Sequence, residues 1–298
     1  MANKIRIMEI ERFATHDGDG IRSTVFLKGC PLHCPWCANP ESQEYRRQIL
    51  HDQSKCTLCK ECEKNSNGII HFEEDKMIID QNRAEECEKA IYECMYDAIY
   101  YDSEDVEIKE ILKTVQKDNH YYINSNGGIT LSGGEPFYNF DNLKLLLENL
   151  SDKYNIAVET TGYTSLDNIK KVNKYIDTYL FDIKHLDIDI FNKIVGGDLK
   201  VILENFQYLA RFYPEKMVVR VPVIYDFNED IVEDIIKYVS ETKINEVHLL
   251  PFHNYGKKKY KNLKMTYDYE DYKSMPLEAL NKYIKIGEKY NIKVVVGG

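Results

Sequence analysis

The stretch Gly29-Cys30-Pro31-Leu32-His33-Cys34-Pro35-Trp36-Cys37 places three cysteines at C-x3-C-x2-C spacing within one short loop. A [4Fe–4S] cubane contains four irons and normally takes one cysteine thiolate on each of them. Three cysteines in one loop would therefore leave one iron free to bind a ligand that is not part of the protein. We expect the chemistry of the protein to take place at that iron.

Two other uses of cysteine compete with this interpretation, because the chain has eight cysteines in 298 residues. Disulfides are typical of secreted chains, whereas residues 1–6 lack an apolar run of signal-peptide length, so we expect a cytoplasmic, reducing location. Structural zinc sites usually combine two separated cysteine pairs, which one compact loop does not supply. The cysteines therefore favour iron–sulfur clusters.

Composition limits the remaining possibilities. With 43% hydrophobic and 30% charged residues, the chain can bury one large core and still carry a small inserted module. The net charge of −10 argues against a nucleic-acid binder, and no stretch approaches the ~20 apolar residues of a membrane span. We interpret the one local basic run, Lys257-Lys258-Lys259-Tyr260-Lys261, as a solvated loop.

The residues on both sides of the cysteine loop resemble a known family. His16-Asp17-Gly18-Asp19-Gly20-Ile21-Arg22 precedes the loop, and Asn39-Pro40-Glu41-Ser42 follows it. Together with the three cysteines they resemble the activating enzymes of glycyl radical enzymes, a branch of the radical S-adenosylmethionine (SAM) superfamily related to the pyruvate formate-lyase activating enzyme. Asp19 stands where that family usually has proline. The resemblance extends through scattered motifs to about residue 260.

This resemblance implies a radical mechanism. A [4Fe–4S] cluster on Cys30, Cys34 and Cys37 would bind SAM at its open iron and cleave it reductively to methionine and a 5′-deoxyadenosyl radical. That radical would take a hydrogen atom from a backbone glycine of a partner glycyl radical enzyme. The reaction needs the low end of the iron–sulfur range of about −700 to +450 mV. An external low-potential electron donor, such as flavodoxin or ferredoxin, and an anaerobic setting are therefore implied.

The resemblance also implies which residues contact SAM. Ser132-Gly133-Gly134-Glu135-Pro136 is similar to the element that holds the SAM amino group, although most glycine pairs after strands are simply tight turns. Asp182-Ile183-Lys184 is similar to the family's D-x-K contact with SAM, with a structural ion pair as the alternative. Trp36 stands where the family places an aromatic residue beside the adenine, and the backbone from Trp36 to Ala38 is expected to contribute.

Three further residues near strand ends complete the expected site. Glu159 occupies a position where relatives carry an acidic ligand for a monovalent cation near the SAM carboxylate. Arg220 alternates inward on its strand and would meet a carboxylate, either of SAM or of a core ion pair. His253 resembles the histidine on the adenosine side, although a lone histidine is more often a core or surface residue.

Residues 51–104 contain the other five cysteines and are interpreted as an insertion. Cys56-x2-Cys59-x2-Cys62 resembles the first half of a bacterial ferredoxin, and Cys94-Met95-Tyr96-Asp97-Ala98-Ile99 resembles its closing motif. We expect a ferredoxin-like domain with one auxiliary [4Fe–4S] cluster on Cys56, Cys59, Cys62 and Cys94.

A second auxiliary cluster is not expected, because its other ligands are missing. In a two-cluster ferredoxin they would fall at Ser66, Ala84 and Ala90, which are not cysteines. Only Cys87 remains of that set, and we expect it to pack as a small apolar side chain.

The flanking residues, 1–50 and 105–298, alternate between strand-like and helix-like patterns, which predicts a parallel sheet. The number of units is too small for an eight-stranded barrel. We therefore expect an α/β protein with a partial (β/α)6 TIM-like barrel, as the resemblance implies, with the site at the carboxyl ends of its strands. The expected strands are residues 5–10, 23–27, 128–131, 155–159, 178–183, 217–224, 246–252 and 292–296. The expected helices are residues 108–115, 143–150, 166–176, 200–212, 229–239 and 276–289, with a further helix through Glu41 and Gln43 capped by Asn39.

Two other functions stay open at this point. A radical SAM enzyme that acts on a small molecule or a ribosomal peptide would share every cofactor motif, and only the two flanking motifs of the cysteine loop argue against it. An iron–sulfur electron-transfer protein is the second alternative. It would need neither the Gly-Gly-Glu element nor an open iron.

Overall fold

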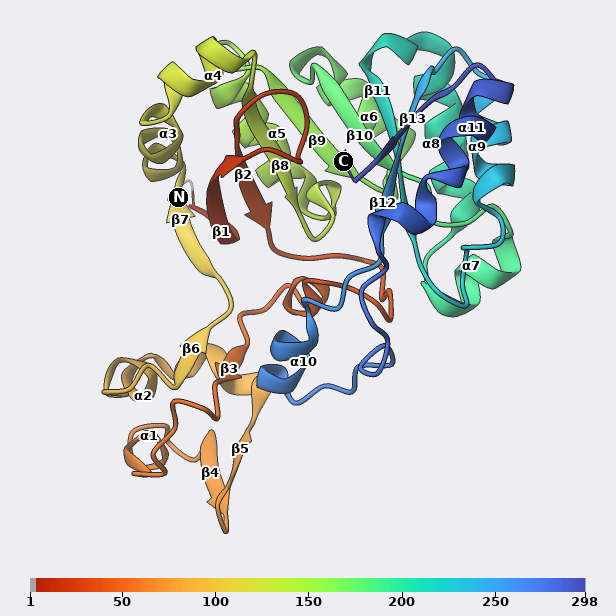
Figure 1. Ribbon diagram of the computed structural model, residues 1–298. Helices are drawn as coiled ribbons and strands as arrows, with labels where there is room; N and C mark the ends of the chain where they lie inside the picture. Colours follow the sequence, from red (N-terminus) through yellow and green to blue (C-terminus); the bar gives the residue numbers. More distant parts are fainter. Residues whose placement is uncertain (1–3, 298) are drawn as a thin grey trace.

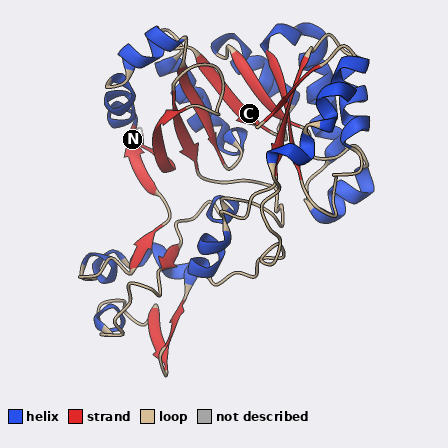
Figure 2. Ribbon diagram, in the orientation of Figure 1, coloured by secondary structure: helices blue, strands red, loops and turns tan. Residues whose placement is uncertain are grey.

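One large mixed sheet dominates the computed structural model, which describes residues 4–297 (Figures 1 and 2). Every neighbouring pair from β2 to β13 is parallel, whereas β1 runs antiparallel to β2 and to β7. The strands follow the spatial order β13 (Lys293–Val296), β12 (Glu246–Pro251), β11 (Met217–Val223), β10 (Thr178–Asp182), β9 (Ile156–Thr160), β8 (Gly128–Gly133), β2 (Arg22–Leu27), β1 (Lys4–Ala14) and β7 (Glu104–Glu107). Since this order is linear within residues 4–297, β13 and β7 are edges, and the α/β class with an open, barrel-like sheet is confirmed.

Helices flank the curved sheet (Figure 2). They are α3 (Ile108–Gln116), α4 (Asn119–Ser125), α5 (Phe140–Leu150), α6 (Leu166–Val172), α7 (Ile188–Ile194), α8 (Leu199–Phe212), α9 (Val232–Ser240) and α11 (Lys282–Lys289). Their apolar stripes form the main core, and all four leucines of the α5 stripe are fully buried, as their spacing predicts. Across residues 4–297, none of the helices has the length and apolar character needed to span a bilayer.

The residues between β3 and β6 form a smaller body beside the sheet, at the bottom of Figure 1. It contains β3 (Ile49–His51), α1 (Glu61–Lys64), β4 (Ile70–Glu73), β5 (Lys76–Ile79), α2 (Glu88–Tyr92) and β6 (Ile99–Tyr101). Antiparallel pairing of β3 with β6 brings its two ends together. Buried side chains such as Ile70, Met77 and Cys87 give it a core separate from the main one. We call this body the insert.

The basic run at 257–261 is not a solvated loop, and that prediction was wrong. It forms α10 (Lys257–Leu263), which lies between the cysteine loop and the insert. Lys259 Nζ lies 2.6 Å from Asn39 Oδ1 and 2.5 Å from Glu41 Oε1, and Lys258 Nζ lies 2.8 Å from Asp52 Oδ2. The lysines are therefore paired with carboxylates from distant parts of the chain.

Other elements also differ from the sequence-based expectation. Residues 40–43 form a 3-10 turn whose Asn39 makes no capping bond, because its side chain accepts from Lys259 instead. The sequence did not predict α4, α7 or β7. The two helices each bury a single side chain, Tyr122 and Phe191, so they show no apolar stripe.

A buried ion pair fastens the insert to the sheet. Lys28 Nζ, directly after β2, lies 2.5 Å from Asp102 Oδ2, and both side chains are fully buried. Lys28 also donates to the carbonyl oxygen of Glu41, and Asp102 accepts from the backbone nitrogen of Gln48 at 3.2 Å. The start of the cysteine loop and both ends of the insert therefore meet at one pair of charges.

Removing one partner of this pair should be costly, because it leaves a buried charge without a counterion. We expect Lys28→Met to lower the free energy of unfolding by about 3–5 kcal/mol, measured by denaturant unfolding under anaerobic conditions. The double variant Lys28→Met/Asp102→Leu should recover most of that loss. A single variant as stable as the parent chain would contradict the proposed importance of the pair.

Candidate active site

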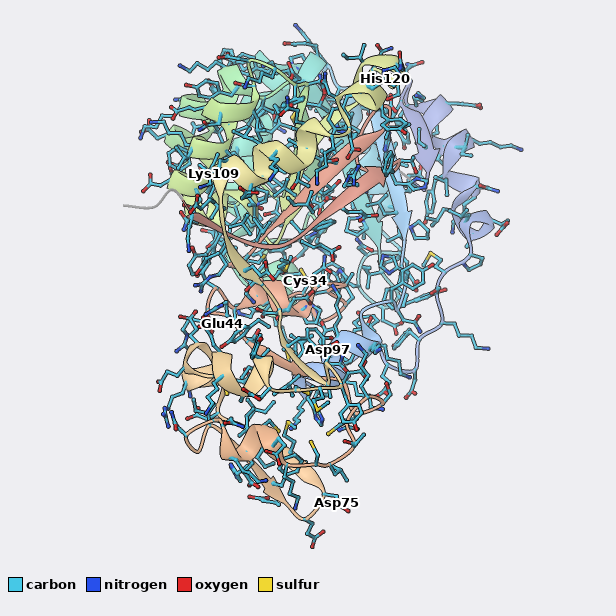
Figure 3. The ribbon with its side chains drawn as sticks, turned by 90° about the vertical axis from the view of Figure 1, so that its left-hand side faces the viewer. Cys34, Glu44, Asp75, Asp97, Lys109 and His120 are labelled. Atoms are coloured by element: carbon cyan, nitrogen blue, oxygen red, sulfur yellow. The ribbon has the colours of Figure 1, made fainter. Side chains whose placement is uncertain are left out.

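The cysteine loop leaves the carboxyl end of β2 and is fixed by its backbone. Leu32 is buried in the main core, and the backbone nitrogen of His33 donates to Val195 O at 2.8 Å, at the end of α7. The backbone nitrogen of Cys37 donates to Cys34 O at 3.1 Å. Figure 3 shows Cys34 at the level where the barrel meets the insert.

The three loop thiols lie close enough to influence one another. Burial raises the pKa of the Cys34 thiol to about 12, and the pKa values of Cys30 and Cys37 are also raised, first of all by burial. In residues 4–297, no three His, Cys, Asp or Glu side chains converge on a position for a single metal ion. Each iron of a cubane binds a different cysteine. Three thiols of one loop that do not converge on a single point therefore fit a cluster. Its binding must displace the thiol protons.

Two glycines let the end of β8 lie against the start of the cysteine loop. A Cβ at Gly133 would lie 2.3 Å from Leu27 N, and one at Gly134 would lie 2.1 Å from Gly29 O. The backbone nitrogens of Gly134 and Glu135 donate to Leu27 O and Gly29 O, at 2.9 and 2.8 Å. Any larger residue here would separate the two segments.

Glu135 is buried, and its carboxylate joins β8 to the end of β9. Oε1 accepts from Thr160 Oγ1 at 2.6 Å and from Phe137 N at 3.2 Å. Oε2 accepts from the Thr161 backbone nitrogen at 2.8 Å and from its hydroxyl at 2.6 Å. Contact of Glu135 with the SAM amino group therefore stays a prediction beside an evident structural role. Sequence reasoning missed the two threonines, which look like ordinary strand formers.

A cavity of about 200 Å³ brings together two loop cysteines and four of the ten predicted SAM residues, namely Trp36, Ala38, Lys184 and His253. It is lined by Cys34, Trp36, Cys37, Ala38, Lys184 and His253, together with apolar residues at the ends of β11 and β12. The Trp36 ring packs on Phe227, with centroids 4.5 Å apart. His253 Nδ1 is buried and has no hydrogen-bond partner among the described residues. This nitrogen is therefore available to a ligand in the cavity.

Asp182 and Lys184 form an ion pair at the end of β10. Lys184 Nζ lies 2.6 Å from Asp182 Oδ2, whereas the buried Oδ1 has no partner within the described chain. Burial alone would lower the pKa of Lys184, but Asp182 and then the Cys34 thiol raise it above its usual value. The ammonium group is therefore protonated beside the cysteine loop. Ile183 is buried in the core, and its backbone nitrogen donates to Arg220 O at 2.9 Å.

Glu159 of β9 and Arg220 of β11 form an ion pair across β10. Arg220 Nη1 lies 3.1 Å from Glu159 Oε1, and Ser132 Oγ donates to Glu159 Oε2 at 2.5 Å. Glu159 therefore has a cationic partner within the chain, and its role as a ligand of a monovalent cation stays a prediction. Arg220 Nε and Nη1 make no hydrogen bond within residues 4–297, although Nη1 is within ion-pair distance. Nε is therefore a buried donor of Arg220 that has neither a hydrogen bond nor an ion pair within these residues.

The four cysteines assigned to the auxiliary cluster line one small cavity of the insert. They are Cys56, Cys59, Cys62 and Cys94. Cys87 does not line this cavity, and its side chain is fully buried in the core of the insert. The Ser66 hydroxyl makes hydrogen bonds to the backbone of Glu63 and Ile70, so it is committed to a turn.

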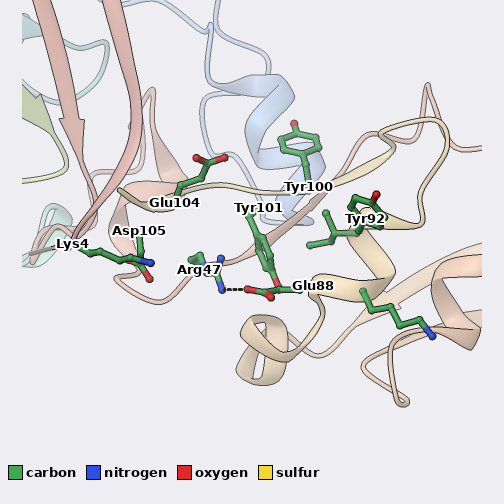
Figure 4. Close-up of a pocket in the computed structure, with 10 residues that line it drawn as sticks. Lys4, Arg47, Glu88, Tyr92, Tyr100, Tyr101, Glu104 and Asp105 are labelled. Carbon is green, nitrogen blue, oxygen red and sulfur yellow. Dashed lines mark hydrogen bonds and ion pairs between the residues drawn. The ribbon is translucent and has the colours of Figure 1, made fainter. Parts of the chain in front are cut away.

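A surface hollow of about 810 Å³ contains none of the predicted site residues. It lies where the insert meets β7 (Figure 4). Arg47 and Glu88, 3.3 Å apart, and the rings of Tyr92 and Tyr101 line it. Because no cysteine lines this hollow, its size does not mark the active site.

Comparison with known proteins identifies the family. The radical SAM superfamily profile matches residues 24–239. Over 98% of this chain and 99% of that protein, the sequence is 33% identical to the trans-4-hydroxy-L-proline dehydratase activating enzyme of Clostridioides difficile. It is 36% identical to the 4-hydroxyphenylacetate decarboxylase activating enzyme of Clostridioides difficile strain 630, over 89% of this chain and 87% of that protein. It is 38% identical to the isethionate sulfite-lyase activating enzyme of Oleidesulfovibrio alaskensis, over 84% of each chain.

The chain therefore belongs to the radical SAM superfamily, whose cofactors are SAM and a [4Fe–4S] cluster. Within that superfamily it is one of the activating enzymes of glycyl radical enzymes. The recognition made from the cysteine loop and its flanks is confirmed.

Replacing Glu135 tests whether this residue acts mainly in stabilising the fold or mainly in contacting SAM. Glu135→Ala would leave the buried donors of Thr160, Thr161 and Phe137 without their acceptor, at about 1–3 kcal/mol for each unsatisfied group. We expect a lower free energy of unfolding in denaturant, with exposed Glu148→Ala as the control. A variant of unchanged stability that binds SAM weakly would instead make Glu135 primarily a SAM ligand.

Proposed function

We propose that Cys30, Cys34 and Cys37 hold the catalytic [4Fe–4S] cluster and that SAM occupies the adjoining 200 Å³ cavity. The observation that carries this proposal is the meeting of two cluster cysteines, Lys184 and His253 around that one cavity. The three cysteines would hold the cluster, and two of them, Cys34 and Cys37, line the cavity. When bound, the cluster supplies the electron that cleaves SAM, and the resulting radical takes a hydrogen atom from a glycine of the partner enzyme.

The side chains around the cavity suit the groups that SAM presents. Lys184 carries a positive charge toward a carboxylate, and Asp182 Oδ1 is a buried acceptor without a donor. Trp36 and His253 offer ring faces and one free ring nitrogen to the adenosine part. Charged hydrogen bonds of this kind contribute about 1.5–3 kcal/mol each, so the residues orient SAM without taking part in electron transfer.

Glu159 and Arg220 provide a polar wall within the barrel. Arg220 Nε is a buried donor without a partner among the described residues, and the Arg220 backbone pairs with Asp182 across β10 and β11. We assign Arg220 to the carboxylate or backbone carbonyl of a bound ligand while it remains paired with Glu159. This arrangement combines the two alternatives that the sequence left open.

We propose that the insert, which runs from β3 to β6, is a ferredoxin-like domain with one auxiliary cluster, and that it corresponds to the expected domain of residues 51–104. Four cysteines line the same cavity, whereas Cys87 packs among Ala84, Ala90 and isoleucines. We further propose that an external low-potential electron donor, such as flavodoxin or ferredoxin, reduces the cluster. The described residues do not themselves supply that electron. The partner that receives the radical is a glycyl radical enzyme.

The function is tested by following SAM directly. Reduced, reconstituted protein should form 5′-deoxyadenosine from SAM and should generate a glycyl doublet in the EPR spectrum of a matching glycyl radical enzyme. Cys34→Ala should abolish both signals, because it removes a ligand of the open-iron cluster, and should lower the iron content by about four per chain. A Cys34→Ala protein that still forms 5′-deoxyadenosine would overturn the assignment.

Iron counting tests the auxiliary cluster. Two cubanes require ~8 iron per chain, and Cys94→Ala should lower this number. Cys87→Ala is the matched control and should leave the iron content unchanged, since the Cys87 side chain belongs to the apolar core. A content of ~12 iron, or a loss of iron with Cys87→Ala but not with Cys94→Ala, would show that the fourth ligand is misassigned.

A further inference from the structure

One buried histidine of the insert, His51, has no part in the sites described above. It is the last residue of β3 and is only 4% exposed, and neither Nδ1 nor Nε2 has a hydrogen-bond partner within residues 4–297. A neutral imidazole has one N–H donor and one acceptor nitrogen. Burial of such groups without partners is unfavourable, so the ring is suited to a polar ligand taken up beside it.

The pairing of β3 with β6 directs His51 toward the core of the insert. His51 pairs with Ile99 in the antiparallel register, and paired side chains lie on the same face of a sheet. Ile49 lies two residues before His51 and therefore shares this face. Because Ile49 and Ile99 both belong to the buried core of the insert, the imidazole lies on the core side of these two strands.

The cavity of the auxiliary cysteines lies on the same side of these strands. Ala98 and Ile99 line this cavity together with Cys94. Two hydrogen bonds connect it to the end of β3. The backbone nitrogen of Asp52 donates to Ala98 O at 2.8 Å, and the backbone nitrogen of Ala98 donates to Cys94 Sγ at 3.3 Å. The strand that carries His51 is therefore bonded to the segment that holds a proposed cluster ligand.

A lysine from the barrel reaches the same part of the insert. Lys264 directly follows α10, which lies beside β3 (Figure 1). Its Nζ donates to the carbonyl oxygen of Met77, whose side chain lines the cysteine cavity. Burial, and then the charge of Lys264, lowers the pKa of His51, although Asp52 acts in the opposite direction. The imidazole is therefore neutral at pH 7 and keeps one N–H to donate.

We propose that His51 donates a hydrogen bond to a sulfur of the auxiliary [4Fe–4S] cluster and thereby raises the reduction potential of that cluster. Hydrogen bonds to the sulfurs are among the factors that set iron–sulfur potentials. Such a donor stabilises the reduced cluster more than the oxidised one, because reduction adds a negative charge. His51 would thus make the auxiliary cluster easier to reduce. This inference rests on the auxiliary cluster of the proposed function.

The test measures the auxiliary cluster by itself in the full-length, reconstituted chain. Cys34→Ala serves as the background, because it removes the catalytic cluster and should leave ~4 iron per chain. Anaerobic redox titration followed by EPR then gives the midpoint potential of the remaining cluster. We expect His51→Leu to keep the iron and to lower the ratio of reduced to oxidised cluster about tenfold at a fixed potential, a shift of about 59 mV for one electron.

Two further variants and one label locate the effect. His51→Gln keeps an N–H donor in its side-chain amide and should restore most of the potential. His71→Leu is the matched control, since it removes an exposed histidine of β4 in the same insert and should leave the midpoint unchanged. With nitrogen-15 in the histidines, pulsed EPR of the reduced cluster should show a coupled histidine nitrogen, and His51→Gln should remove this coupling.

An unchanged midpoint in His51→Leu with ~4 iron bound, or an equal shift in His71→Leu, would overturn the role of His51 and leave the auxiliary cluster assigned as before. If His51→Leu does not hold iron, the nitrogen coupling decides, and its absence in the Cys34→Ala background overturns the inference. If the Cys34→Ala chain itself holds no iron, the proposed auxiliary cluster and the role of His51 both fail.

Discussion

The buried pair of Lys28 and Asp102 is the constraint on which the arrangement of this protein depends. It joins the first residue after β2 to the point where the chain leaves the insert, and it also holds the carbonyl of Glu41. The cysteine loop and the insert are thereby fixed to the same place on the sheet. Desolvation opposes such a pair, so its contribution is the unique position that it imposes on the loop.

A second constraint acts from the other side of the loop. Gly133 and Gly134 allow backbone contact with the loop, and the Glu135 carboxylate then connects that contact to Thr160 and Thr161. The residues that resemble a cofactor-binding element thus also form a structural junction between two strands. In this protein the same short segment supports the cysteine loop and ties it to the end of β9.

Sequence reasoning worked where the signal is local. The three loop cysteines, the α5 leucines and the central strands follow from spacing and periodicity, and the structure confirms the loop position, the helix and the sheet. It failed at α10, which has no apolar stripe and is held by carboxylates far away in the chain. Sequence reasoning also could not predict the hydrogen bonds that Thr160 and Thr161 donate to Glu135, or the ion pair of Lys28 with Asp102. Residue type does not reveal which residues distant in the sequence become partners.

The position of α10 also affects how the protein is made. Lys259 contacts Asn39 and Glu41 across 220 and 218 residues of sequence. At about 5–20 residues per second of synthesis, some 10–45 seconds pass between the emergence of the cysteine loop and that of the helix beside it. The nascent chain therefore exposes the thiols of the cysteine loop to solvent for that interval, before the helix that lies beside them exists.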